Sequence, residues 1–123
     1  MRRTLQLGLV VAALAGCSSP GGEPTSYQLM EFAIDGPDRL GAGAETVTVG
    51  NRGEFPHTLV ITDATGTVVA ATSLIPPGES SDLALDLDPG AYSVTCRIVA
   101  QTPDGGIVDH FEAGMHTTLR IGD

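Results

Sequence analysis

Turn-forming sequences interrupt this chain so often from Tyr27 onward that no long element fits between them. Examples are Asp35-Gly36-Pro37, Pro76-Pro77-Gly78 and Pro89-Gly90. The runs between the turns are short, and several alternate polar with apolar residues, as strands with one buried face do. Seven or so short strands, with a turn roughly every eight to twelve residues, are typical of an antiparallel β-sandwich.

The expected strands fill one domain, because the chain shows no internal repeat, no helical period and no second set of elements. In the run from Ser80 to Leu87, three leucines recur at every second position and define one apolar face. The sequence predicts an all-β domain with strands at Tyr27–Ile34, Glu45–Gly50, Thr58–Thr62, Val68–Leu74, Ser80–Leu87, Ala91–Cys96 and Thr117–Ile121.

The N-terminal residues have the composition of an export signal. A basic start, Met1-Arg2-Arg3, precedes an apolar run from Leu5 to Ala15, which is short for a membrane span and typical of a signal-peptide core. Leu14-Ala15-Gly16-Cys17 resembles the lipobox of bacterial lipoproteins, whose cysteine becomes the lipidated first residue; the alternative is an ordinary secretory signal with a chance cysteine. We expect a signal peptide (1–16), a flexible tether beginning at lipidated Cys17 (17–26) and a folded domain (27–123).

With Cys17 lipidated, Cys96 is the single remaining thiol of an exported protein. Such a thiol usually pairs, oxidises or binds metal, although a buried cysteine also serves as a small apolar core residue. His57 opens a predicted strand, and His110 and Met115 follow Cys96 along the chain. A thiolate and two imidazoles form a trigonal ligand set suited to copper, and a thioether is its usual weak axial ligand. The candidate ligands of one copper ion are therefore His57, Cys96, His110 and Met115.

Three segments of the chain resemble the cupredoxins, the plastocyanin-like blue (type 1) copper proteins. The segments are Asn51-x-Gly53-x-x-x-His57, Pro89-Gly90-x-Tyr92-x-x-x-Cys96 and His110-x-x-x-Gly114-Met115. The resemblance implies an antiparallel Greek-key sandwich of about seven to eight strands, with copper near one end and a role in electron transfer. In cupredoxins the second histidine reaches the surface within an apolar patch where partners dock. Here the residues expected to form that patch are Ile98, Val99, Ile107, Val108 and Phe111.

One departure from the family is the length of the segment between Cys96 and His110. It has thirteen residues, many more than the small electron carriers have there. Its centre, Pro103-Asp104-Gly105-Gly106, is strong turn chemistry flanked by β-branched residues, so we expect a small hairpin that returns His110 beside Cys96. His116 is expected at the surface, with a site that uses it in place of His110 as the alternative.

Three functions remain open: a one-electron carrier, a copper storage or delivery protein, and a metal-free binding lipoprotein with the same fold. An enzyme is not expected, since the sequence has no second histidine cluster and no Ser-His-Asp or paired-carboxylate arrangement. Six arginines and no lysine stand against fifteen acids, which disfavours binding to nucleic acid and to anionic lipid.

Attachment to a membrane would therefore come from acyl chains on Cys17. We expect a monomer outside the cytoplasm, anchored to a bacterial membrane, that meets an unidentified redox or copper-handling partner protein.

Overall fold

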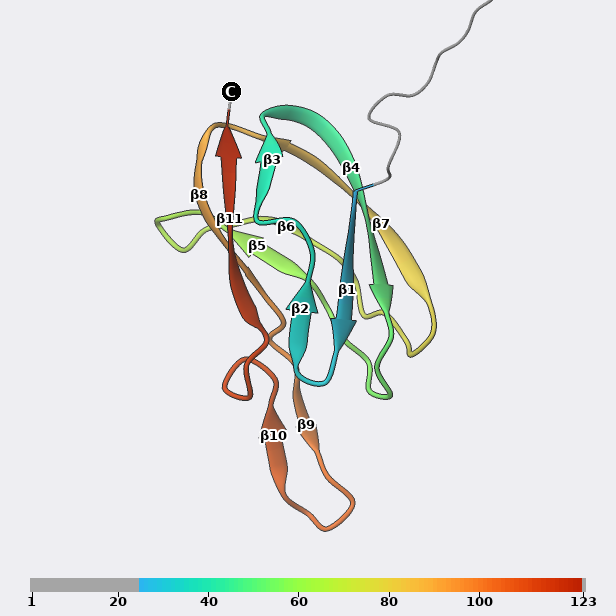
Figure 1. Ribbon diagram of the computed structural model, residues 1–123. Coiled ribbons are helices and arrows are strands. Elements are labelled where there is room, and N and C mark those ends of the chain that lie inside the picture. Colours follow the sequence, from blue (N-terminus) through green and yellow to red (C-terminus); the bar gives the residue numbers. More distant parts are fainter. Residues whose placement is uncertain (1–24, 123) are drawn as a thin grey trace, which may run out of the picture.

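Two β-sheets lie face to face in the computed structural model, which describes residues 25–122 (Figure 1). The first sheet contains four strands, in the order β2 (Ala33–Asp35), β1 (Ser26–Met30), β4 (Gly43–Asn51) and β7 (Ser80–Leu87). The second contains five, in the order β3 (Arg39–Gly41), β11 (His116–Gly122), β8 (Gly90–Thr95), β5 (Val60–Thr62) and β6 (Val68–Ala71). A separate hairpin, β9 (Val99–Gln101) with β10 (Ile107–Asp109), projects from the end of the sandwich opposite the C terminus.

The expectation of an all-β sandwich is confirmed, and the residues that the structure describes include no helix that could cross a membrane. The expected signal peptide (1–16), Cys17 and nearly all of the tether lie outside the described residues.

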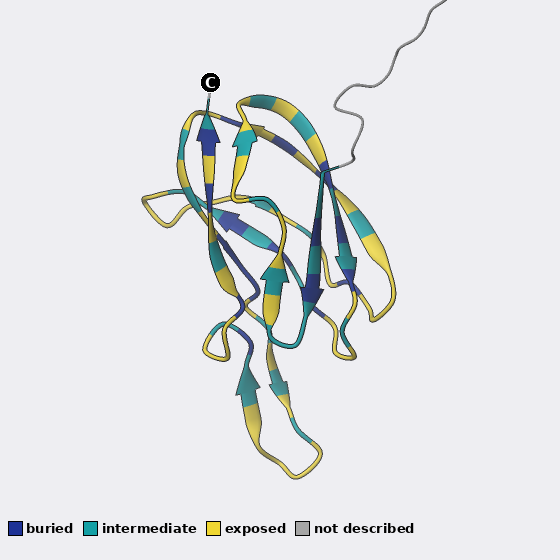
Figure 2. Cartoon of the chain, viewed as in Figure 1, coloured by how far each residue is buried: buried dark blue, intermediate teal, exposed yellow. Residues whose placement is uncertain are grey.

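Alternating residues of the two sheets form a single core. In β7, Leu83, Leu85 and Leu87 are buried while their neighbours are exposed or half-buried, as the sequence pattern predicted. They meet apolar residues of the opposite sheet, including Val94 and Leu119. Figure 2 shows this alternation as bands of dark blue and yellow along the strands. The core holds the two sheets together and so fixes the positions of the loops at their ends.

The expected strand Tyr27–Ile34 is wrong as a single element. β1 ends at Met30, and the chain reverses through Glu31 and Phe32 into β2, which pairs antiparallel with β1. No Gly, Pro, Asn or Asp occupies the reversal, so the run carries no turn signal of the usual kind. This tight reversal places Glu31 and Phe32 at the end of the sandwich rather than on a sheet face (Figure 1).

The sheets are also not purely antiparallel, which corrects the sequence-based topology. β1 pairs parallel with β4, and β3 pairs parallel with β11. Between β1 and β4 the chain crosses to the second sheet, where β3 pairs, and then returns. Parallel neighbours require such a crossover, whereas a two-residue hairpin can join only antiparallel ones.

The hairpin expected between Cys96 and His110 is present as an arm, defined here as β9, β10 and the turn between them. Thr102 N–H donates to Gly106 O at 2.9 Å, and Gly105 adopts a left-handed φ of 91° that favours glycine. At the base of the arm, His110 N–H donates to Ile98 O at 2.9 Å. The arm therefore leaves and rejoins the sandwich at one point, and Figure 2 shows it largely exposed.

Candidate metal centre

Three loops at the arm end of the sandwich bring the predicted ligands together. His57 lies in the loop after β4, where its backbone pairs with Ile75 in both directions, at 3.2 and 2.8 Å. Cys96 directly follows β8, and His110 directly follows β10. All three side chains are fully buried. Residues 53 positions apart thus meet because each stands at the end of a strand or bridge held by the core.

The donor atoms of these residues form a small triangle. His57 Nδ1 lies 3.2 Å from His110 Nδ1, and Cys96 Sγ lies 3.9 Å from the first and 3.7 Å from the second. The point equidistant from all three is about 2.1 Å from each, close to the ~2.0–2.3 Å of bonds from nitrogen and sulfur ligands to a first-row metal. Among the described residues, this is the one cluster of histidine, cysteine and carboxylate groups with metal-binding geometry.

Met115, the fourth predicted ligand, is fully buried, and its backbone is hydrogen-bonded to other predicted ligands. Its N–H donates to His110 O at 3.0 Å, and its carbonyl accepts the N–H of Cys96 at 3.0 Å. The methionine is therefore tied to two of the other three predicted ligands. This donor set of two imidazoles, one thiolate and one thioether suits a single copper ion of the type 1 kind.

The sulfur of Cys96 accepts the backbone N–H of Thr58, the residue that follows His57, and also contacts the Thr58 hydroxyl. Thr58 N–H lies 3.5 Å from Cys96 Sγ, and the Thr58 hydroxyl lies 3.9 Å from it. The N–H contact ties the sulfur of Cys96 to the loop that carries His57.

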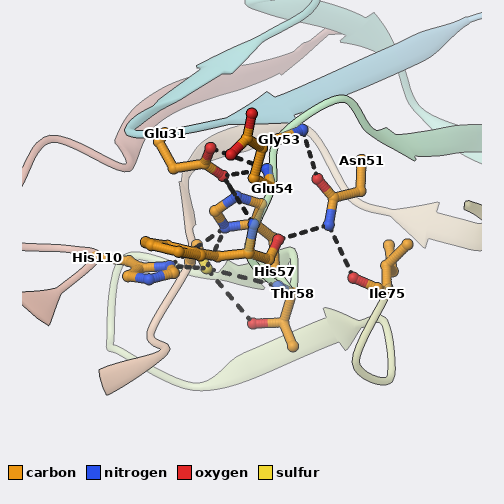
Figure 3. A network of polar contacts seen from close by, with 10 residues as sticks. Glu31, Asn51, Gly53, Glu54, His57, Thr58, Ile75 and His110 are labelled. Atoms are coloured by element: carbon orange, nitrogen blue, oxygen red, sulfur yellow. Dashed lines mark hydrogen bonds and ion pairs between the residues drawn. The ribbon is translucent and has the colours of Figure 1, made fainter. Parts of the chain in front are cut away.

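Asn51 holds the histidine loop in shape from a buried position. Its amide nitrogen donates to Phe55 O at 2.8 Å and to Ile75 O at 2.9 Å, and its oxygen accepts Gly53 N–H at 2.8 Å. Figure 3 shows these bonds around His57. The asparagine of the sequence motif therefore acts on the backbone of the loop and contacts none of the three donor atoms.

Glu31, from the reversal between β1 and β2, contacts the outer nitrogen of His57. Its Oε2 lies 2.7 Å from His57 Nε2, and its carboxylate also accepts the backbone N–H of Glu54 at 2.9 Å and of Phe55 at 3.3 Å (Figure 3). Desolvation works to raise the pKa of Glu31, but hydrogen bonds from the Glu54 amide, the His57 ring and the Phe55 amide hold the pKa below its ordinary value. The sequence did not single out Glu31, because the pattern placed it in the middle of a strand.

His110 differs from the expectation that the second histidine reaches the surface. Its side chain has no exposed area, and its Nε2 is buried without a hydrogen-bond partner among residues 25–122. Phe32 covers its ring at a centroid distance of 5.0 Å, and Phe55 stacks on it at 6.2 Å and 23°. Desolvation, followed by the nearby His57, lowers the pKa of His110. The two phenylalanines, which the sequence pattern did not single out, therefore stand between this histidine and solvent.

The expected apolar patch is only partly assembled. Val99 and Ile107 are 61% and 72% exposed on the arm, whereas Phe111 packs beneath the guanidinium of Arg97, 4.2 Å from its ring centre. A hollow of about 380 Å³ lies beside Phe55 and under the arm; its lining is Phe55, Pro56, Leu74, Ile98, Ala100, Gln101, Thr102 and Val108. His116 is exposed and contacts Phe111, so it lies outside the donor triangle, as expected.

Comparisons with solved structures identify the fold. The chain is similar to reduced auracyanin from the photosynthetic bacterium Roseiflexus castenholzii, at 19% identity over 80% of this chain and 95% of that one, with a TM-score of 0.60. It is also similar to an azurin from Methylomonas sp. strain J, at 15% identity over 83% and 99% of the two chains and a TM-score of 0.60. A multi-copper oxidase from Pediococcus acidilactici matches at 13% identity and a TM-score of 0.59, over 98% of this chain but 33% of the oxidase.

No family model matches the chain, and no characterised protein resembles it significantly in sequence. The fold and the donor set together confirm the class that the sequence motifs indicated: a cupredoxin-type β-sandwich with a site suited to one copper ion.

Proposed function

We propose that this protein is a type 1 copper-binding, one-electron carrier, with His57, Cys96, His110 and Met115 as its copper ligands. The observation that carries the proposal is the buried triangle of two Nδ1 atoms and one Sγ, with edges of 3.2–3.9 Å. Copper bound there would supply a Cu(I)/Cu(II) couple.

The chain's own contribution is to hold the donors in place and exclude water. Loops fixed by the core, by Asn51 and by the Thr58 bond to Cys96 leave the ligands little room to rearrange. A site that changes shape little between two oxidation states suits electron transfer. The complete burial of all three triangle residues also favours a retained metal over one that is delivered to another protein.

Non-enzymatic function is part of the proposal. The described residues contain one metal-binding cluster, and no second group of histidines lies beside it as a catalytic copper would need. The neighbours in fold include auracyanin and azurin as well as a multi-copper oxidase, so the fold alone does not separate a carrier from an enzyme, and the single metal-binding cluster is the observation that favours the carrier.

The site of action in this proposal is the outer face of a bacterial membrane, with the lipid on Cys17 as the anchor. Support comes from the N-terminal sequence alone: the basic start, the short apolar run and the small residues before Cys17. Metabolic labelling with a fatty acid tests it, because labelling of the full chain and its loss in Cys17→Ser are expected. A full chain that takes up no label contradicts the anchor.

Partner docking is proposed at the apolar hollow beside Phe55. Leu74 is 54% exposed at its rim, and Val108 lines it from the arm. A charge placed in a desolvated contact is costly, so Val108→Glu is expected to slow electron exchange with the redox partner. An unchanged rate contradicts docking at this surface.

The copper assignment is tested by the visible absorption spectrum of the domain after addition of Cu(II). An intense blue or green band that is absent in Cys96→Ser is expected, because the band requires thiolate bound to copper. His116→Ala is the matched control and should keep the band. A colourless protein whose Cys96 is reduced, and which also fails to bind Cu(I), overturns the assignment and leaves a metal-free binding protein.

The choice between carrier and delivery protein is tested by competition with a Cu(I) chelator. Slow loss of the metal is expected for a carrier with buried ligands. Rapid loss would favour the storage or delivery function instead.

A further inference from the structure

The two histidines of the donor triangle are supported unequally. His57 Nε2 has a carboxylate 2.7 Å away, whereas no described residue offers a hydrogen-bond partner to the buried His110 Nε2. Both rings present Nδ1 to the triangle. The Glu31 carboxylate therefore distinguishes His57 from His110.

The Glu31 carboxylate settles which nitrogen of His57 carries hydrogen. An ionised carboxylate only accepts hydrogen bonds, so the nitrogen that faces it bears the N–H. In a neutral imidazole the other nitrogen then carries the free lone pair. That other nitrogen is Nδ1, the atom that faces Cys96 Sγ and His110 Nδ1.

The position of the carboxylate is built by two separate parts of the chain. The reversal between β1 and β2 supplies Glu31, and the histidine loop supplies the backbone N–H groups of Glu54 and Phe55 that bind its oxygens. The Glu31 side chain is 23% exposed, so its charge is only partly screened by water. Two backbone N–H groups orient it toward the ring, and that of Glu54 is shared between both carboxylate oxygens.

Gly53 provides the space for this contact. A Cβ atom at position 53 would lie 1.9 Å from Glu31 Oε2 and 2.9 Å from His57 Nε2 (Figure 3). A side chain at position 53 would therefore push the flexible Glu31 carboxylate away and crowd the His57 ring, so the glycine of the Asn51-x-Gly53 motif lets the carboxylate stay beside His57.

We propose that Glu31 is a positioning residue for copper: it holds His57 with Nδ1 toward the metal, and its negative charge favours Cu(II) over Cu(I). This inference rests on the proposed copper function. A carboxylate that accepts the outer N–H of a metal-bound histidine fixes the ring and raises its basicity, and its loss typically changes metal affinity about 10–100-fold.

The test replaces Glu31 with glutamine, which keeps the size and a hydrogen-bond acceptor but removes the charge. Glu54→Gln is the matched control, since it makes the same change in net charge at an exposed side chain on the neighbouring loop. In Glu31→Gln, we expect the ratio of Cu(II) to Cu(I) affinity to fall about tenfold, which is a reduction potential about 59 mV more positive. In Glu54→Gln, we expect less than a third of that shift.

A second readout needs no copper. Long-range ¹H–¹⁵N spectra of the metal-free protein report which nitrogen of His57 carries hydrogen. We expect the Nε2–H form of His57 in the wild type and a mixture of both forms in Glu31→Ala.

The inference is overturned when the copper band is intact but Glu31→Gln shifts the potential no more than Glu54→Gln. It is also overturned when His57 keeps the Nε2–H form in Glu31→Ala. A wild-type protein that binds no copper overturns the proposed function itself. This outcome is measured on the wild type and is therefore distinct from any result with the two Glu31 variants.

Discussion

Phe55 stacks on His110 with its ring inclined by 23° and centred 6.2 Å away, while 38% of the Phe55 side chain faces solvent. The aromatic ring is thus the outer layer of a site whose second histidine is itself fully buried. Phe55 therefore separates the ring of His110, a proposed copper ligand, from solvent on this side.

Removing that cover should make bound metal easier to extract. In Phe55→Ala, water and chelator gain access to His110, so Cu(I) loss to a chelator is expected to accelerate about tenfold, because the apolar shell controls access to a metal site. Leu74→Ala is the control, since Leu74 lines the same hollow and makes no ring contact with His110. Equal rates in the two variants would show that Phe55 does not protect the site.

Gly53→Ala should reproduce the effect of removing the Glu31 charge. The new methyl group occupies the place of Glu31 Oε2, so the flexible carboxylate is displaced from His57. We expect a reduction potential shifted in the same direction as in Glu31→Gln. The double variant should add little, because two changes that remove one interaction are not additive.

The control for that cycle is Gly41→Ala, since a Cβ at Gly41 meets nothing within 4 Å. Its potential should match the wild type. Fully additive shifts in the double variant would mean that Gly53 and Glu31 act on the site independently.

Asn51→Ala should destabilise even the metal-free protein. It leaves the Phe55 carbonyl and the Gly53 N–H without this partner and removes one of the two hydrogen bonds to the Ile75 carbonyl, which still accepts the His57 N–H. Because the Asn51 side chain is buried, we expect a loss of about 2–4 kcal/mol in the free energy of unfolding. Urea denaturation measures this loss. Thr48→Ala, which removes an exposed hydrogen bond to Asp82, should cost less than about 1 kcal/mol. Similar losses in both variants would contradict the role assigned to Asn51.

Tyr27 should make stability fall at alkaline pH. Burial, with a contribution from the charge of Asp38, raises the pKa of Tyr27 to about 12 from 10.0, and its hydroxyl donates to Pro37 O at 2.8 Å. The folded protein therefore holds a proton that the unfolded chain releases. The resulting stability is complete below pH 10 and is lost as the pH rises toward 12, at most about 2–3 kcal/mol.

Urea midpoints between pH 9 and 12 measure this dependence, with Tyr27→Phe as the control that lacks the ionisable hydroxyl. The slope of stability against pH should be smaller in the variant over that window. Identical slopes would show that another group controls alkaline unfolding.

The sequence could indicate that His57, Cys96 and His110 form one cluster, because the chemistry of a candidate copper site is carried by residue type and order. A lone cysteine followed by histidine and methionine, after an earlier histidine in an Asn-x-Gly loop, is an informative pattern in the amino-acid sequence itself. The turn of the arm was predictable for a similar reason, since Pro103, Asp104 and two glycines mark it locally.

Glu31, Phe32 and Phe55 could not be found in that way, because their roles arise from contacts across the fold. The reversal at Glu31 and Phe32 has no turn residues, so the pattern from Tyr27 to Ile34 indicated one continuous strand. Because the reversal was not predicted, the sequence did not indicate that the Glu31 carboxylate contacts His57 or that the Phe32 ring covers His110. The parallel pairing of β1 with β4 was missed as well, since strand patterns carry no direction.

In a short copper loop, the length of the loop and the spacing of the ligands at its ends are coupled. Here the arm is closed at its base, so the two are separate. Asp109 pairs with Val99, and His110 N–H binds Ile98 O, so the thirteen-residue segment is already fastened before it reaches either ligand. Residues at its tip can be exchanged, lengthened or trimmed while Cys96 and His110 keep their spacing. Changes at the tip are therefore expected to leave the geometry of the donor triangle unchanged.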